Sequence, residues 1–162
     1  ARHTAAIVAV AVSGCAQAGD PQEPANTIAA VLESGVAYEA DTRVMESFPV
    51  QIATVVTATN TRSRSIDITF PDGCVVLLRA YSDAARTQLV WDQGEHVGCT
   101  MALVEWDLAP GTSQTARAGT GAREILGDAL PDGEYWLDAV LRPDGRTVTV
   151  PAGSVQLAIP RG

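Results

Sequence analysis

The side chains suited to catalysis are few, and they match no familiar catalytic set. His96 is the one histidine after the N-terminal 15 residues, so a Ser-His-Asp relay would have to use it. Ser154 lies in Ala-Gly-Ser-Val-Gln, which lacks the second glycine of a nucleophile elbow. The chain contains no glycine loop that would cradle a phosphate, and no lysine that could form a Schiff base. We therefore predict that the protein is not an enzyme, and that no hydrolase activity depends on His96.

Two pairs of carboxylates occur at strand-like spacing, Glu105 with Asp107 and Glu134 with Asp138. Residues two or four apart on a strand share one face, and we expect this face to be solvated in both cases. The segment Asp92–His96 is the best candidate for metal or ligand contact, because it carries two carboxylates and an imidazole. Its spacing fits no defined ligand set, and hard cations need more oxygen ligands. We expect an ordinary polar loop there, and neither a metal nor a cofactor.

One of the three cysteines lies near the N-terminus and the other two lie inside the domain. Cys15 follows an apolar run near the N-terminus, whereas Cys74 and Cys99 lie inside the domain. An exported chain reaches an oxidising compartment, so we expect these two to form a disulfide. Closing this loop would stabilise the fold by roughly 3–4 kcal/mol in the chain-entropy model. A zinc site is the poorer alternative, because the sequence has no C-x-x-C pair.

The segment Gly98–Leu103 is similar to the exposed binding loop of some substrate-like serine protease inhibitors. There, a disulfide cysteine stands just before a threonine and an apolar residue that enters the protease pocket. The candidate partner-binding residues of this region are Glu95, His96, Thr100 and Met101. The alternative is that Thr100 to Leu103 begins the next strand, with Met101 in the core. We expect burial of Met101, and hence no micromolar inhibition of trypsin, chymotrypsin or subtilisin.

The N-terminus resembles a bacterial export signal. Ala5–Val12 is uncharged and apolar. It is shorter than the roughly 20 residues needed to span a bilayer, but fits the apolar region of a signal. The ending Val-Ser-Gly-Cys looks like a lipobox, which implies cleavage before Cys15 and a lipid on its sulfur. An A-x-A site ending at Ala18 is the alternative, and it would release a soluble secreted protein.

Length and charge limit the remaining function classes. The chain has 162 residues and a formal charge of −8, with a pI near 4.6. We expect an export signal over 1–15, a tether over 16–34 and one domain over 35–162. An acidic chain is repelled by phosphate backbones, so we expect the protein not to bind nucleic acid. Contact with a membrane would come through the lipid anchor alone.

The pattern after Gly35 is that of short strands separated by Gly- and Pro-containing turns. For 27–33 the sequence does not separate a short helix from a first strand. We predict an all-β fold, an antiparallel β-sandwich of about 7–9 strands, with core positions for Trp91, Trp106 and Trp136. The expected strands lie within 36–44, 50–59, 66–70, 74–81, 88–92, 103–108, 113–118, 134–141, 147–150 and 154–159.

An ordered set of short motifs then carries a family resemblance. These motifs are Thr-Asn-Thr at 59–61, Ile66–Gly73, Val-Trp-Asp at 90–92, Leu-Ala-Pro-Gly at 108–111 and Leu130–Trp136. From about Val50 to Leu157 the chain resembles the BsuPI-type intracellular proteinase inhibitor family. The resemblance implies an immunoglobulin-like sandwich without catalytic machinery.

The chain departs from that family by its export signal and its pair of domain cysteines. An intracellular protease therefore cannot be its natural target. We expect a non-catalytic exported lipoprotein, anchored at the periplasmic or extracellular face of the cell envelope. Its expected role is protein recognition or a structural part in the envelope, with an unidentified protein as partner. The alternative is an inhibitor of an extracytoplasmic serine protease.

Overall fold

The computed structural model describes residues 30–45 and 51–160, and almost all of its regular structure is β. The expected export signal, Cys15 and most of the expected tether lie outside these residues. The elements, in chain order, are β1 (Val31–Glu33), β2 (Val36–Met45), β3 (Gln51–Asn60), β4 (Ile66–Phe70), β5 (Leu77–Tyr81), β6 (Leu89–Asp92), the 3₁₀ turn η1 (Gln93–Glu95), β7 (Val104–Leu108), β8 (Ser113–Gly121), α1 (Ala122–Leu126), β9 (Gly133–Leu141), the 3₁₀ turn η2 (Pro143–Gly145) and β10 (Val148–Leu157).

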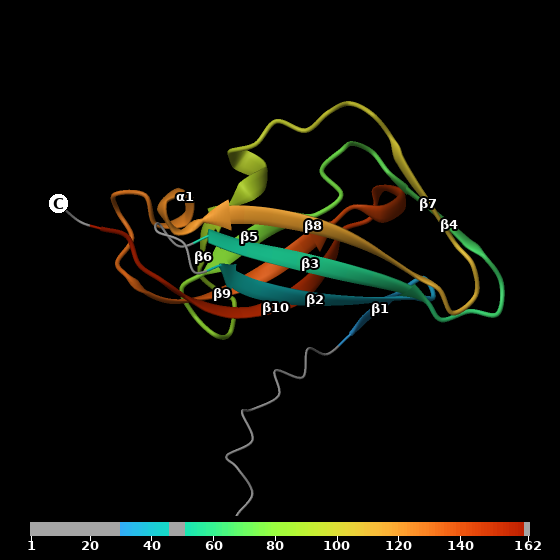
Figure 1. Ribbon diagram of the computed structural model, residues 1–162, viewed down its shortest axis with the longest axis horizontal. Coiled ribbons are helices and arrows are strands. Elements are labelled where there is room, and N and C mark those ends of the chain that lie inside the picture. Colours follow the sequence, from blue (N-terminus) through green and yellow to red (C-terminus); the bar gives the residue numbers. More distant parts are fainter. Residues whose placement is uncertain (1–29, 46–50, 161–162) are drawn as a thin grey trace, which may run out of the picture.

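The strands form two four-stranded sheets and a two-stranded ribbon. One sheet has the order β1-β2-β3-β8, the other has the order β10-β9-β5-β6, and β4 pairs with β7 alone. All pairings are antiparallel. Figure 1 shows the first sheet in front of the second, with the β4–β7 ribbon extending to one end of the molecule. The expected all-β antiparallel sandwich is confirmed.

Alternation of side chains explains how the strands build the core. Along β3, every second residue from Ile52 to Asn60 is buried and the residues between them are not. A strand with this pattern turns one face to a second layer, so its apolar positions meet those of the facing sheet. The largest fully buried side chains come from both sheets, from the ribbon and from α1: Tyr38, Phe70, Ile52, Ile68, Leu78, Leu108, Leu126, Leu137, Leu141 and Leu157.

Several boundaries differ from those expected. The strand β1 resolves the open choice for residues 31–33, and the sheet therefore begins four residues before Gly35. Val148–Leu157 is one strand with a bulge between Pro151 and Ser154, where two strands were expected. The loose segment after Gly119 contains the short helix α1. The described residues form ten strands, slightly more than the expected count of about 7–9.

The turn between β9 and β10 follows its sequence signature. Asp144 and Gly145 both have positive φ, at 51° and 74°, which the Asp-Gly pair tolerates in hairpin turns. Asp144 also accepts a hydrogen bond from the backbone N–H of Thr69 at 3.0 Å. The turn therefore ties the ribbon to the second sheet through β4.

Candidate functional site

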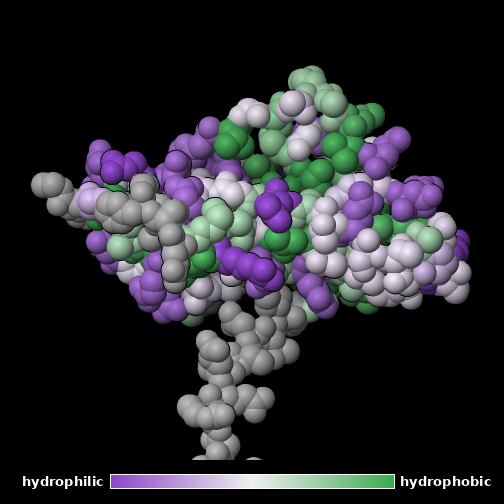
Figure 2. Space-filling model, in the orientation of Figure 1, coloured by the Kyte–Doolittle hydropathy of each residue, from purple (hydrophilic) through white to green (hydrophobic). Residues whose placement is uncertain are grey.

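The long segment between η1 and β7 is the candidate site. Figure 1 shows it arching along the upper edge of the molecule, outside the two sheets. We call residues 97–103 the stapled loop. It carries three of the large apolar side chains that the described residues expose, namely Val97 (41% exposed), Met101 (96%) and Leu103 (65%). Hydrophobic atoms accordingly gather at this edge in the space-filling view (Figure 2).

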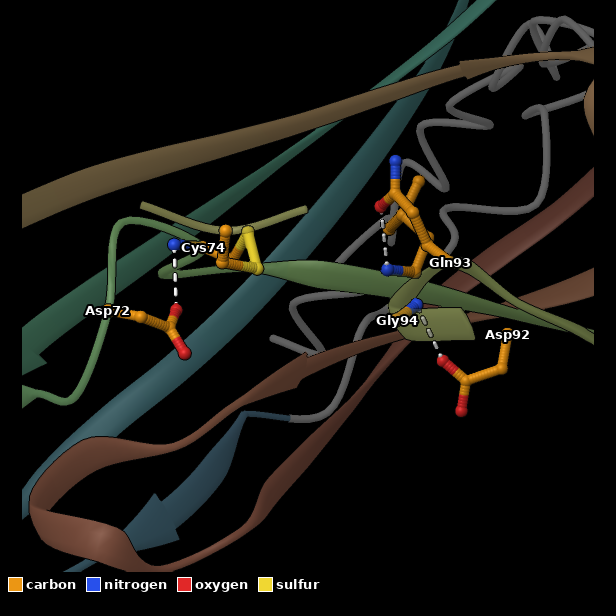
Figure 3. The surroundings of a disulfide bond; sticks show 7 residues. Asp72, Cys74, Asp92, Gln93 and Gly94 are labelled. Atoms are coloured by element: carbon orange, nitrogen blue, oxygen red, sulfur yellow. Dashed lines mark hydrogen bonds between the residues drawn. A yellow bond between two sulfur atoms is a disulfide. The ribbon is translucent and has the colours of Figure 1, made fainter. Parts of the chain in front are cut away.

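A disulfide holds the middle of the stapled loop to the start of the β5 segment (Figure 3). Cys74 and Cys99 are bonded, with their Cα atoms 5.4 Å apart, so the expected disulfide is confirmed. The Asp72 carboxylate accepts a hydrogen bond from the backbone N–H of Cys74 at 2.9 Å. The backbone N–H of Gly73 donates to the Thr100 carbonyl at 3.0 Å. The residues on both sides of the disulfide are thus fixed by main-chain contacts.

Gly73 is also the residue of the turn before Cys74 against which Thr100 of the loop packs. A Cβ atom at this position would lie 2.1 Å from the Thr100 hydroxyl oxygen. No such distance occurs between real side chains, so only glycine leaves room for Thr100 without a shift. The turn before Cys74 therefore sets the position of the residue next to Met101.

The exposure of Met101 corrects our expectation that it is buried. Thr100 to Leu103 do not form a strand, and β7 begins at Val104. The register of the ribbon gives the physical reason. Val104 pairs with Phe70, so Leu103 would have to continue the ladder opposite Pro71. Proline has no N–H to donate, and the ladder therefore ends there.

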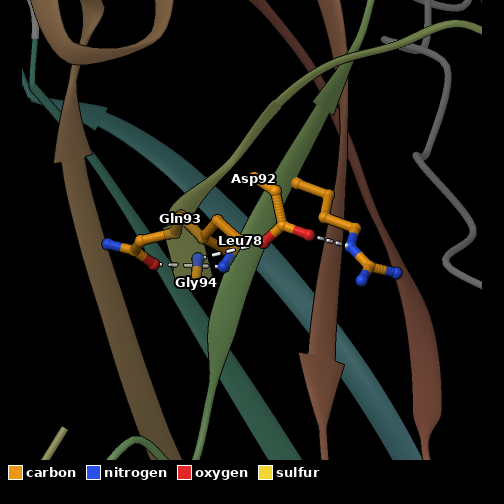
Figure 4. Close-up of polar contacts among 5 residues, drawn as sticks. Leu78, Asp92, Gln93 and Gly94 are labelled. Carbon is orange, nitrogen blue, oxygen red and sulfur yellow. Dashed lines mark hydrogen bonds and ion pairs between the residues drawn. The ribbon is translucent and has the colours of Figure 1, made fainter. Parts of the chain in front are cut away.

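Gln93 anchors the other end of the loop to both sheets (Figure 4). Its buried side-chain carbonyl accepts from the backbone N–H of Leu78 in β5 at 3.1 Å. Its amide donates to the carbonyl of Gly119 in β8 at 2.9 Å. The backbone carbonyl of Gln93 accepts from the N–H groups of His96 and Val97. One side chain therefore joins the two sheets directly beneath the loop.

Both oxygens of the Asp92 carboxylate already have partners within the protein, so Asp92 is not free to bind a metal or another ligand. One carboxylate oxygen accepts from the N–H of Gly94 at 2.9 Å, and the other lies 2.7 Å from the guanidinium of Arg79. That hydrogen bond raises the pKa of Arg79. Both groups are partly buried, so the pair is better shielded from solvent than a surface ion pair. The carboxylate serves to cap η1 and to hold it against β5.

Glu95 and His96, two of the predicted partner-binding residues, are exposed at the start of the loop. The His96 ring stacks on Trp91 with 6.0 Å between ring centroids and 10° between planes. The two are separated along the chain from Thr100 and Met101, which lie beyond the disulfide. The structure thus exposes all four predicted residues, with Glu95 in η1, His96 directly before the stapled loop, and Thr100 and Met101 within it.

One cysteine-containing group could resemble a metal site by distance. Among the described residues, Asp72, Cys74 and Cys99 are the only three metal-ligating side chains whose ligand atoms lie within 4.8 Å of one another. The two sulfurs are joined to each other, so neither is available as a thiolate ligand. The group is therefore part of the staple.

The surface beside the loop is hollowed. A groove of about 380 Å³ separates Val97 and the segment 73–77 from residues 116–118 of β8. Because β8 is an edge strand of its sheet, this groove runs between the loop and an edge with no further strand beside it. The loop consequently stands away from the sheet edge and is accessible from more than one side.

Sequence reasoning missed a charged network on the outer face of the second sheet. Asp138 was expected to be solvated with Glu134, but its side chain is only 5% exposed and lies 2.6 Å from the guanidinium of Arg86. Burial raises the pKa of Asp138, and the charge of Arg86 opposes this shift. The two side chains therefore form a largely buried ion pair. Only the fold of the loop before β6 could have revealed this partner.

That loop is held by a second carboxylate, Asp83. Its oxygens accept from the N–H groups of Thr87 and Gln88 at 2.7–3.1 Å, and these bonds, the one from Gln88 first, lower the pKa of Asp83. Arg86 takes a positive φ of 55° within this turn, which directs its side chain over the sheet.

The prediction that all three tryptophans lie in the core is confirmed for Trp91 and Trp106, which are buried, whereas Trp136 is only half-buried.

No helix among the described residues is long and apolar enough to cross a membrane. No protein-family model matches the chain, and no curated protein matches it.

Among solved structures, a β-glucosidase from Erythrobacter marinus is similar at 13% identity over 72% of this chain and 15% of its own, with a TM-score of 0.35. A β-glucosidase from Listeria innocua in complex with glucose is 11% identical over 76% of this chain and 17% of its own, with a TM-score of 0.37. The structural genomics target SoR45 is 14% identical over 80% of this chain and 91% of its own, with a TM-score of 0.35. The chain thus spans less than one fifth of either β-glucosidase. Likenesses this distant carry no argument about what this chain does.

Proposed function

We propose that this chain is a non-catalytic protein-recognition domain of the bacterial cell envelope, exported and held at the membrane by a lipid on Cys15. The observation that carries the proposal is the 96% exposure of Met101 on a loop fixed by a disulfide and by main-chain hydrogen bonds. Large apolar side chains at interfaces act as anchors that enter a pocket of the partner. The staple lowers the ordering cost of binding, because the loop is held before the partner arrives.

Two further points support this assignment. A disulfide that closes a 25-residue segment suits a protein that works in an oxidising compartment outside the cytoplasm. The resemblance to BsuPI-type domains, with their immunoglobulin-like sandwich, also suits a role in binding. Under this proposal the two sheets serve as a rigid frame, and the partner contacts the stapled loop.

Photo-crosslinking in living cells tests the proposal. A photoreactive amino acid replaces Met101 in one variant and Leu89 in a control, since Leu89 is an apolar β6 residue that is 49% exposed outside the loop. We expect a discrete adduct from position 101 and none from position 89. Adducts from position 89 alone, or identical adducts from both positions, would remove the loop as the recognition element.

The second candidate function is inhibition of an extracytoplasmic serine protease by the same loop. The specific observation in its favour is again the exposed Met101, which follows the disulfide-bonded Cys99 by two residues. The expectation of no inhibition rested on burial of Met101, and that premise is wrong. Exposure on a held segment is what a substrate-like inhibitor requires, because the residue must enter the primary pocket of the protease.

Inhibition assays separate the two candidates. Under the second candidate, the domain inhibits chymotrypsin or subtilisin at micromolar concentration, and Met101→Arg transfers inhibition to trypsin. Under the first alone, the wild type and Met101→Arg leave all three enzymes fully active. Inhibition that is the same for the wild type and Met101→Arg would show that another surface is responsible.

A further inference from the structure

The exposed surface of the stapled loop continues without a break into β7. Leu103 is followed by a strand in which Glu105 and Asp107 face solvent, while Trp106 and Leu108 are buried. Alternate residues of a strand lie about 7 Å apart on one face. The chain thus exposes Met101 and Leu103 in the stapled loop, and then two carboxylates on one face of β7.

The partner strand adds a third carboxylate. In the register of the ribbon, Asp67 of β4 lies directly opposite Asp107, and Thr69 lies opposite Glu105. Asp67 is exposed like the two acidic residues of β7. Like charges in directly opposed positions destabilise a strand pair. The ribbon therefore carries an unfavourable charge arrangement on its outer face.

None of these carboxylates is neutralised within the part of the chain that the structure describes. The four ion pairs found there join Arg43, Arg79, Arg86 and Arg146 to other acidic residues. The three carboxylates also do not belong to the one close group of metal-ligating side chains in that part of the chain. A cation held by several of them at once is thus not what the arrangement favours.

We propose that Met101, Leu103, Glu105, Asp107 and Asp67 form one docking surface, here called the apolar–acidic surface, for a protein partner that carries a basic patch beside an apolar pocket. This inference rests on the proposed recognition role of the stapled loop and adds the chemistry of the partner. A basic patch would neutralise the carboxylates that the ribbon leaves unpaired. Opposite charges across the interface would also speed the encounter and fix the orientation of the partner. The three carboxylates lie on one face of the ribbon, and the two apolar residues lie in the segment directly before β7, so the five fit within one side of a standard interface.

Matched charge variants test the inference. The first variant, Asp67→Asn/Glu105→Gln/Asp107→Asn, neutralises the apolar–acidic surface. The control, Glu39→Gln/Glu124→Gln/Asp128→Asn, removes the same number of charges from exposed residues that make no ion pair among the described residues. Both variants change the net charge equally, and neither removes a buried group. The first should unfold at a slightly higher denaturant concentration than the wild type, since it relieves the repulsion between Asp67 and Asp107.

The probe is a short synthetic peptide with two leucines and then two arginines at alternate positions, followed by amide chemical shifts in NMR titrations. We expect shifts concentrated at 101–107 and 67–69, with binding weakened about fivefold in the first variant and less than about twofold in the control. Added salt should weaken wild-type binding more than that of the first variant. Equal weakening in both variants would show an effect of net charge alone, and shifts away from these residues would overturn the inference.

Met101→Ser separates this inference from the proposed function. If Met101→Ser abolishes peptide binding but the first charge variant does not, the loop is the anchor and the acidic extension is wrong. If the charge variant weakens binding but Met101→Ser does not, the ribbon binds cations and the loop is not the recognition element. Loss in both variants, with none in the control, is the expected result.

Discussion

Single polar side chains decide how the stapled loop is supported, and Gln93 is the clearest case. Its amide joins the Leu78 N–H of one sheet to the Gly119 carbonyl of the other. A buried polar group that loses its partner costs about 1–3 kcal/mol. The loop therefore depends on one residue that sequence patterns marked only as part of a polar segment.

We predict that Gln93→Leu destabilises the protein by about 1–3 kcal/mol, because it leaves the buried N–H of Leu78 without its partner and removes the bond to the part-buried carbonyl of Gly119. Denaturant unfolding measures this loss. Gln156→Leu is the control, since Gln156 is exposed on β10 and its replacement should change stability by less than about 0.5 kcal/mol. Similar values for the two variants would contradict the bridging role of Gln93.

The buried pair of Asp138 and Arg86 predicts a pH-dependent variant. Desolvation raises the pKa of Asp138, and Arg86 opposes this, so Arg86→Met raises that pKa further. Above the raised pKa the carboxylate is charged and keeps only the weaker contributions of Tyr81 and Arg79, so the substitution costs up to about 3 kcal/mol. Below it the carboxyl group is neutral, and the cost falls.

Arg86→Met should therefore be much less destabilising near pH 4 than at pH 7, as unfolding measured across this range will show. Arg43→Met removes an exposed ion pair, 81% and 59% exposed, and should have almost no effect at either pH. A penalty for Arg86→Met that does not change with pH would contradict the ionisation of Asp138.

At the scale of elements, the turn before Cys74 and the end of the ribbon position the stapled loop. The β4–β7 ladder ends just before Pro71, and the missing side chain of Gly73 leaves room for that of Thr100. The strand pattern of residues 103–108 was readable from the sequence, and so was the disulfide. The burial of Met101 was extrapolated from that pattern, and it was wrong because the β4–β7 ladder ends at the Phe70–Val104 pair, before Met101 is reached. Pairing register is a long-range property that alternation within one segment does not contain.

Two glycine variants on the same loop system test how Met101 is presented. Gly73→Ala places a methyl group 2.1 Å from the Thr100 hydroxyl oxygen, so we predict displaced amide resonances at 99–102 and a weaker Gly73–Thr100 hydrogen bond. Gly98→Ala meets no atom within 4 Å and should leave these resonances nearly unchanged. Adding Thr100→Ala to Gly73→Ala should restore the loop. Failure of this rescue would show that the close approach of Thr100 does not set the loop.

At the scale of the whole molecule, the fold class was predictable and the functional surface was only partly so. Periodicity and turn residues were enough to predict an all-β antiparallel sandwich. The outer-face network of Arg86 and Asp138 was not, because it depends on a loop that folds back over the sheet. The acidic net charge of −8 was visible at once, but the alignment of Asp67 with Asp107 required the register.

The proposed lipid anchor at Cys15 also gives a prediction at this scale. Mass spectrometry of the mature protein purified from membranes should find an N-terminus at Cys15 with a diacylglycerol on its sulfur. Cys15→Ser should then release the domain into the soluble fraction, because the lipid provides the membrane contact. An unmodified N-terminus at Gly19 would show cleavage after Ala18 and a soluble protein instead.

The central claim is that the stapled loop is the recognition element, and the affinity of the partner captured at position 101 tests it most directly. Its dissociation constant is measured with the wild type, Met101→Ser and Leu89→Ser. We predict that Met101→Ser weakens binding by at least about tenfold, as expected for an interface anchor, and that Leu89→Ser weakens it by less than about twofold. Equal effects of the two substitutions, or no effect of Met101→Ser, would contradict the claim.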